Sequence, residues 1–179
     1  MSYIKRDKNK QGSAGDIALA GILCALCFVL TYFSSMIDVV DLSAVILSAC
    51  VVTVSVIEIG RYYPYLIWIA AGILCMLLVP RKDIALEFVM FGGIYPMIKS
   101  LAERLPKLLS WVVKIVFFNA VFTLWYLAVR FLFGLEAGFT FGVVAYLAAN
   151  AFFILADVFL TMAISLYIQK IRPRIRKRK

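Results

Sequence analysis

The sequence predicts an all-α membrane protein with six transmembrane helices and both termini in the cytoplasm. Hydrophobic residues fill 64% of the 179 positions and charged residues only 16%, against roughly 45 to 50% and about 25% in an ordinary soluble domain. At about 20 residues for each membrane-spanning helix, six spans need about 120 residues and leave short loops and two tails. The apolar runs are also longer than the roughly ten alternating residues of a barrel strand. We therefore predict helical spans rather than a soluble domain or a barrel.

The first three apolar runs each end at charged residues or proline. They cover residues 17–37, 42–57 and 63–79. Asp38 and Asp41 flank the turn after the first run. Arg61 follows the second run, and Pro80 ends the third because proline cannot continue a helix without losing a hydrogen bond. The pattern predicts three consecutive spans joined by short turns.

The last three runs include the shortest span and the most distinctive local string. They cover residues 84–98, 108–133 and 139–168. In the fourth run, Gly92, Gly93 and Pro96 predict a kink that serves as a hinge or a docking element. Apolar residues then recur at helical spacing over residues 98–107, which predicts a short interfacial helix. That helix would anchor the connection at the headgroups or dock a partner.

The distribution of the basic residues predicts the orientation. With the N-terminus inside, the inner segments hold fifteen Lys and Arg residues and the outer segments hold three. Basic residues concentrate on the cytoplasmic side of membrane proteins, and an even number of spans places both termini on that side. We therefore predict basic cytoplasmic tails at 1–16 and 169–179 around a transmembrane domain at 17–168. The tails fit contact with anionic lipid of the cell membrane better than contact with nucleic acid.

Missing residue types exclude several classes of enzyme. The sequence contains no histidine, which excludes His-based triads, His metal sites and imidazole proton relays. It contains no G-x-x-x-x-G-K-[ST] motif, so any ATP-driven work must come from a partner. Cys24 and Cys27 form C-x-x-C, but all four cysteines lie in apolar spans, which favours packing over redox or metal chemistry. We therefore expect no enzyme activity, no cofactor and no metal.

Polar and aromatic residues gather at membrane depth in the second half of the chain. Ionisable side chains inside a bilayer are costly and indicate function. In the predicted topology, Glu87 lies about one turn inside the outer end of the fourth span, and Arg130 lies near the outer end of the fifth, so the two side chains could face each other. Aromatic walls with a few polar anchors are typical of small-molecule sites. The predicted outward-facing solute pocket consists of Glu87, Trp125, Tyr126, Arg130, Tyr146 and Asn150.

Simpler interpretations of these residues stay open. The two charged residues also fit a structural ion pair or snorkelling to the interface, and the two aromatic residues of the fifth span also fit an aromatic belt. Nearer the inner side, Asp157 and Lys114 predict an interhelical pair that is structural or relays protons. Asp38 and Asp41 either gate an outer pocket or lie in a solvated turn.

Small residues in the first span carry a resemblance to a known family. Gly21 and Ala25 are spaced one helical turn apart, which permits close helix approach within this chain or to another subunit. Together with six spans and cytoplasmic termini, the string GILCAL at 21–26 resembles the substrate-binding S components of energy-coupling factor (ECF) vitamin transporters. In that family, an alanine-x-x-x-alanine motif in the first span docks on a transmembrane coupling subunit driven by two ATPases. Here Gly21 stands in the place of the first alanine and Ala25 in the place of the second.

The resemblance implies a binding subunit that captures a small, vitamin-like nutrient at the outer face of the cell membrane. Its partners would be the coupling subunit and the ATPases of an ECF module. Two other functions stay open. A non-transport assembly or scaffold protein would pair its polar residues internally and lack an outer pocket. A stand-alone gradient-driven carrier would need Asp157 and Lys114 to face a continuous polar path.

Overall fold

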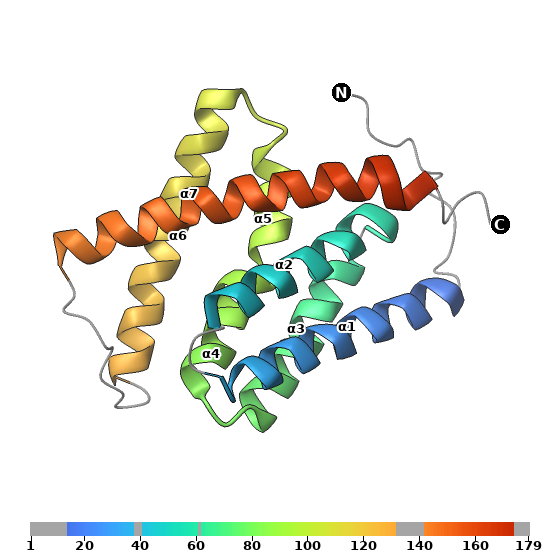
Figure 1. Cartoon of the computed structure of the whole chain (residues 1–179), viewed down its shortest axis with the longest axis horizontal. Helices are drawn as coiled ribbons and strands as arrows, with labels where there is room; N and C mark the ends of the chain where they lie inside the picture. The colour runs from blue at the N-terminus through green and yellow to red at the C-terminus, as the bar shows by residue number, and fades with distance from the viewer. Residues whose placement is uncertain (1–13, 38–40, 61, 132–141, 174–179) are drawn as a thin grey trace.

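The computed structural model describes residues 14–37, 41–60, 62–131 and 142–173. Within these ranges the chain forms helices and no strand, which confirms the predicted all-α fold (Figure 1). The elements are α1 (Ala14–Ser34), α2 (Asp41–Glu58), α3 (Tyr63–Leu78), α4 (Lys82–Glu87), the π-helical η1 (Phe88–Gly92), α5 (Tyr95–Ala102), α6 (Lys107–Phe131), α7 (Val143–Leu166) and the π-helical η2 (Tyr167–Ile171).

Five helical stretches of the described chain are long and apolar enough to cross a membrane. They are α1, α2, the stretch from α4 through α5, α6, and α7 with its extension into η2. The remaining apolar helix, α3, has 16 residues, or about 24 Å at 1.5 Å per residue. These six stretches correspond in order to the six predicted runs. The chain is therefore a multi-pass α-helical membrane protein.

The first described helix begins and the last described helical element ends at the same side of the bundle, as an even number of spans requires. The start of α1 and the end of η2 both lie at the right of Figure 1. An ion pair of 3.2 Å between Arg172 Nε and Glu58 Oε1 ties the chain after η2 to the end of α2. Most of the two predicted tails, together with Asp38, Arg61, the end of the fifth run and the start of the sixth, lies outside the described residues.

The first three helices and α4 enclose a core of small and apolar side chains. Helix α1 packs along both α2 and α3. Cys27, Val52, Ala71, Cys75 and Phe88 are completely buried in one cluster. The buried cysteines therefore fill space between helices, the packing role that their position in apolar spans favours.

The fourth span is interrupted near its middle. Helix α4 passes into η1, residues 93 and 94 form a turn, and α5 begins at Tyr95 with Pro96 in its first turn. The Trp68 indole N–H on α3 donates to the Val89 carbonyl oxygen at 2.8 Å. It thereby gives a hydrogen-bond partner to a carbonyl inside the wider π turn. The interruption that the glycine pair and the proline predict is present.

A separate interfacial helix over residues 98–107 is not present. Helix α5 carries the fourth span on to Ala102, residues 103–106 form the connection, and α6 begins at Lys107. The physical reason is the environment of Lys99, which faces the protein interior and is buried against Asp157 rather than lying at the headgroups.

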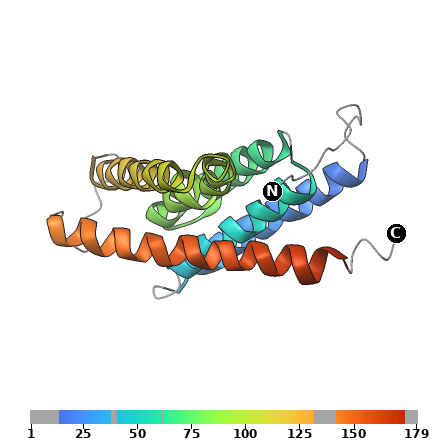
Figure 2. The ribbon, with the colours of Figure 1, turned by 90° about the horizontal axis from the view of Figure 1, so that it is seen from above.

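Figure 2 shows how the later helices enclose the bundle. Helix α7 runs along one side of the molecule, and α6 lies toward the other side. Helix α7 contacts both α2 and α6, while η1 contacts α2, α3 and α6. The four elements α2, η1, α6 and α7 therefore surround a common space.

Candidate functional site

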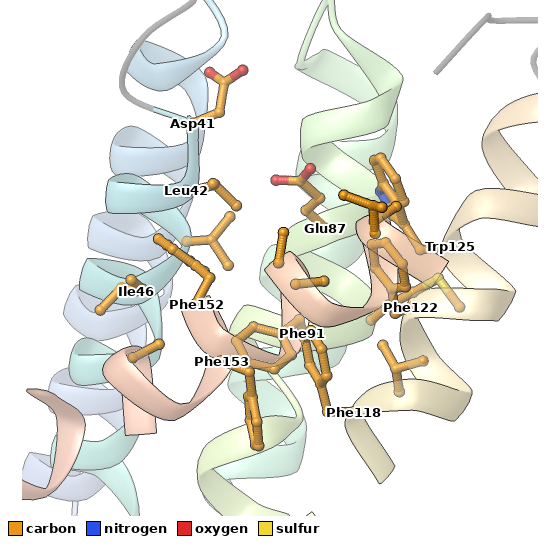
Figure 3. Close-up of a pocket in the computed structure, with 18 residues that line it drawn as sticks. Asp41, Leu42, Ile46, Glu87, Phe91, Phe118, Phe122, Trp125, Phe152 and Phe153 are labelled. Atoms are coloured by element: carbon orange, nitrogen blue, oxygen red, sulfur yellow. The ribbon is translucent and has the colours of Figure 1, made fainter. Parts of the chain in front are cut away.

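A pocket of about 850 Å³ lies between α2, the α4–η1 segment, α6 and α7 (Figure 3). It is formed by the beginning of α2, the second half of α6 and the first half of α7, which the predicted topology places in the outer half of the membrane. Its volume falls within the roughly 300 to 1,000 Å³ of small-molecule sites. The aromatic side chains that line it are Phe91, Phe118, Phe122, Trp125, Phe152 and Phe153.

Aromatic contacts connect the pocket wall from its outer end to its floor. On α6, Trp125 stacks with Phe122 at 6.3 Å between ring centroids, and Phe122 stacks with Phe118 at 5.9 Å. Phe118 stacks on Phe153 of α7 at 4.5 Å. Phe91 of η1 meets both of these last two rings edge to face. Rings from three elements thus form one continuous apolar surface.

Two carboxylates line this otherwise apolar pocket, and they have different surroundings. Asp41 Oδ2 pairs with the Arg81 guanidinium at 3.0 Å, and its Oδ1 accepts a hydrogen bond from the Ser34 hydroxyl at 3.3 Å. Glu87 Oε2 is buried and has no hydrogen-bond partner in the described chain. Figure 3 shows the Glu87 carboxylate on the pocket side of its helix, level with Trp125. Glu87 is therefore the polar group of the pocket that a ligand can pair with.

Of the predicted site residues, Glu87 and Trp125 line the pocket. The Trp125 indole N–H donates to the Asp83 carbonyl oxygen at 3.3 Å, which fixes the ring against α4. Tyr126 is buried, and its hydroxyl accepts a hydrogen bond from Arg130 at 3.2 Å. Tyr126 and Arg130 do not belong to the pocket lining.

The expected pairing of Glu87 with Arg130 is not formed in the described chain. The ion pairs among the described residues include neither side chain. Arg130 is exposed at the outer end of α6 and bonds one turn back along its own helix. Arg130 lies at the end of α6, but its side chain is not part of the pocket lining that contains Glu87.

Tyr146 and Asn150 connect α6 to α7 beside the pocket instead of lining it. Asn150 and Asn119 exchange two amide hydrogen bonds of 2.9 and 3.0 Å. The Tyr146 hydroxyl lies 2.7 Å from Thr123 Oγ1. Polar side chains at membrane depth commonly find such partners on a neighbouring helix. These two predicted site residues therefore join the helices that form the pocket walls.

A buried charge cluster lies beyond the pocket floor, toward the side that the predicted topology places in the cytoplasm. Asp157 Oδ2 pairs with Lys114 at 3.0 Å, so the interhelical pair that the sequence predicts is present. Asp157 Oδ1 also accepts from Lys99 and, at 2.5 Å, from the Tyr95 hydroxyl. The Tyr95 ring stacks on Phe91 of the pocket at 5.0 Å. The aromatic floor is thereby in direct contact with the charge cluster.

Sequence reasoning missed most of the aromatic lining. Phe118, Phe122 and Trp125 recur four and three positions apart, so one face of a helix carries all three rings. That periodicity was a usable signal. Phe152 and Phe153 are adjacent in sequence and carry no such pattern.

The small residues of the first three helices divide into two groups. Ser48 and Ala49 on α2 and Ala71 on α3 are buried against neighbouring helices. Gly21 and Ala25 on α1 are exposed, and no described residue lies within 4 Å of a Cβ placed on Gly21. The α1 pair therefore does not pack against another helix of the described chain.

Comparison with protein-family models gave no match, and comparisons with curated proteins and with solved structures gave no significant match. Membership of the ECF S components therefore stays a prediction from the resemblance. What the structure adds is the bundle, the pocket and the charge cluster.

Proposed function

We propose that the chain is the membrane-embedded binding subunit of an ECF-type transporter and captures a small, vitamin-like solute from the outer face of the cell membrane. The observation that carries this proposal is the aromatic pocket, which has the volume of a small-molecule site. The lining residues come from the outer half of the bundle in the predicted topology. The side chains of Phe91 and Phe153 pack against Tyr95 below it, which supports capture from one side.

In the proposed transporter this chain binds the solute and other subunits hydrolyse ATP, so the chain itself needs no energy-coupling motif. The sequence lacks a phosphate-binding loop, so a coupling subunit and its ATPases supply the work. The exposed Gly21 and Ala25 face of α1 is the proposed docking surface for that coupling subunit. Small residues on that face allow the backbone of a partner helix to approach closely.

The pocket and the charge cluster argue against the two other functions, a scaffold protein and a gradient-driven carrier. A scaffold protein has no use for an outer pocket with a carboxyl group that has no partner among the described residues. A gradient-driven carrier needs its charged groups along a polar path, whereas Asp157 and Lys114 are buried, bonded to each other and absent from the pocket lining. The pocket and the paired cluster therefore favour solute capture.

Native mass spectrometry of the full chain, purified gently, tests this function. We expect the wild-type protein to retain a small molecule. Ala149→Trp places a large ring in the pocket lining and should abolish the retained mass. Ala151→Trp, on an exposed face of the same helix outside the lining, is the matched control and should keep it. A wild-type protein without a retained molecule, identical to Ala149→Trp in this respect, would contradict solute capture and favour a scaffold.

A further inference from the structure

We infer that the pocket takes an amphipathic organic cation, with an aromatic or aliphatic body against the ring wall and an ammonium-type group against Glu87. This inference rests on the proposed function and specifies the chemical class of its solute. It follows from the charges in the pocket, the surroundings of each charged group and the arrangement of the rings.

The charge balance of the pocket lining is negative. Among the described residues, the lining contains the carboxyl groups of Asp41 and Glu87 and no Lys or Arg side chain. Asp41 is already paired with Arg81, which also binds Asp83 at 2.9 Å. Glu87 is therefore the carboxyl group of the lining that has no ion-pair partner among the described residues.

The donors nearest to Glu87 along the pocket wall already have other partners. The Trp125 indole N–H donates to the Asp83 carbonyl oxygen, and the Arg81 guanidinium pairs with Asp41 and Asp83. Glu87 Oε2 is left buried without a hydrogen bond in the described chain. Burying a carboxylate without a partner is costly, and a cation or a strong donor offsets that cost. A ligand ammonium group is the partner whose charge and donors both fit.

The ring wall stabilises the same kind of ligand. A cation within about 6 Å of an aromatic face is attracted by the negative face of the ring, and this attraction is strongest where water is excluded. Trp125 and Phe122 lie on the side of the pocket nearest Glu87 in Figure 3, and Phe118 and Phe153 lie farther along it. The first pair fits the charged end of the ligand, and the second pair fits its apolar body.

Other ligand classes fit the pocket less well. An anion would meet carboxylates without a basic side chain in the lining to offset its charge. A neutral apolar ligand would fill the ring wall and leave the Glu87 carboxylate buried and unpaired. The lining therefore selects for positive charge as well as for apolar area.

Three probes with one shared body test this inference on the full chain in mild detergent. 4-Phenylbutylammonium, 4-phenylbutanol and 5-phenylpentanoate share a phenyl ring and four methylene groups and differ only in the end group, and calorimetry measures the affinity of each. We expect the cation to bind at least about tenfold more tightly than the alcohol, and the anion to bind most weakly. Glu87→Gln keeps the shape and removes the charge, so it should abolish the preference for the cation over the alcohol.

Two further variants make the outcomes decisive. Glu58→Gln removes a carboxylate at the inner end of α2, where it pairs with Arg172, and should leave the preference unchanged. Ala149→Trp should reduce binding of every probe because it fills the pocket. Equal affinities for cation and alcohol, an unchanged preference in a folded Glu87→Gln protein, or no binding of the cation to wild type would each overturn the inference. A solute retained by wild type and lost in Ala149→Trp would still uphold capture, so the two proposals can fail separately.

Discussion

Asp157→Asn removes the carboxylate that holds the inner halves of α5, α6 and α7 together. In the native chain Asp157 accepts hydrogen bonds from Lys99, Lys114 and Tyr95. The asparagine side chain has the same shape, but it carries no charge and turns one acceptor into a donor. Two buried ammonium groups would then lose their principal counter-ion.

The expected loss of stability follows from what remains after the substitution. Removing one partner of a buried ion pair costs roughly 3 to 5 kcal/mol. Glu103, which is 46% exposed, still lies 3.0 Å from Lys99 and 3.7 Å from Lys114. The Thr161 hydroxyl also stays 2.8 Å from Lys99. These remaining partners place the expected loss near the lower limit, at about 3 kcal/mol.

Reversible unfolding in mixed micelles of dodecyl sulfate and dodecyl maltoside measures this loss of free energy. Asp83→Asn is the control, because Asp83 pairs with Arg81 in a more exposed setting and should cost less than about 1 kcal/mol. Combining Asp157→Asn with Lys114→Met removes one of the two stranded cations and should recover part of the loss. If Asp157→Asn costs no more than the control, the cluster does not stabilise the bundle and the reasoning is wrong.

Two further predictions concern glycines with opposite surroundings. Gly93→Ala should destabilise the chain by about 1 to 3 kcal/mol in the same unfolding assay, because a Cβ would lie 2.2 Å from Trp68 Cδ1. A loss of stability near zero would show that the indole moves aside freely. Gly21→Leu should leave stability nearly unchanged, since its surroundings are open, but should reduce co-purification of a coupling subunit and ATPases in mild detergent. Ala151→Leu, on an exposed face of α7, is the control for that experiment, and equal recovery of partners by both variants would exclude the α1 face as the docking surface.

The sequence predicts the fold well because membrane spans are encoded locally. A long apolar run between charged residues or proline is sufficient to define a span in lipid. The second run, 42–57, corresponds to Asp41–Glu58, and the third, 63–79, to Tyr63–Leu78. The prediction of an interfacial helix over 98–107 was wrong because a tertiary contact, the burial of Lys99, overrides the local amphipathic pattern.

The candidate pocket is less predictable because position along the chain gives depth but not the direction of a side chain. Tyr126, Arg130 and Asn150 lie on the helices that form the pocket walls, yet they bond within or between those helices. Rotation of a membrane helix about its axis depends on packing against its neighbours. Glu87 and Trp125 lie in the pocket lining because the packed helices turn them there.

The π-helical segment η1 gives the fourth span an orientation that a regular helix would not have. A π turn holds more residues than an α turn, and each residue of an α-helix adds about 100° of rotation. Glu87 directly precedes this segment and Tyr95 follows it. Rewinding that single turn would swing the carboxylate around the helix axis while the tyrosine stayed bonded to Asp157. The π turn therefore sets the angle about the helix axis between Glu87 and Tyr95. That angle determines whether both side chains face the interior of the bundle.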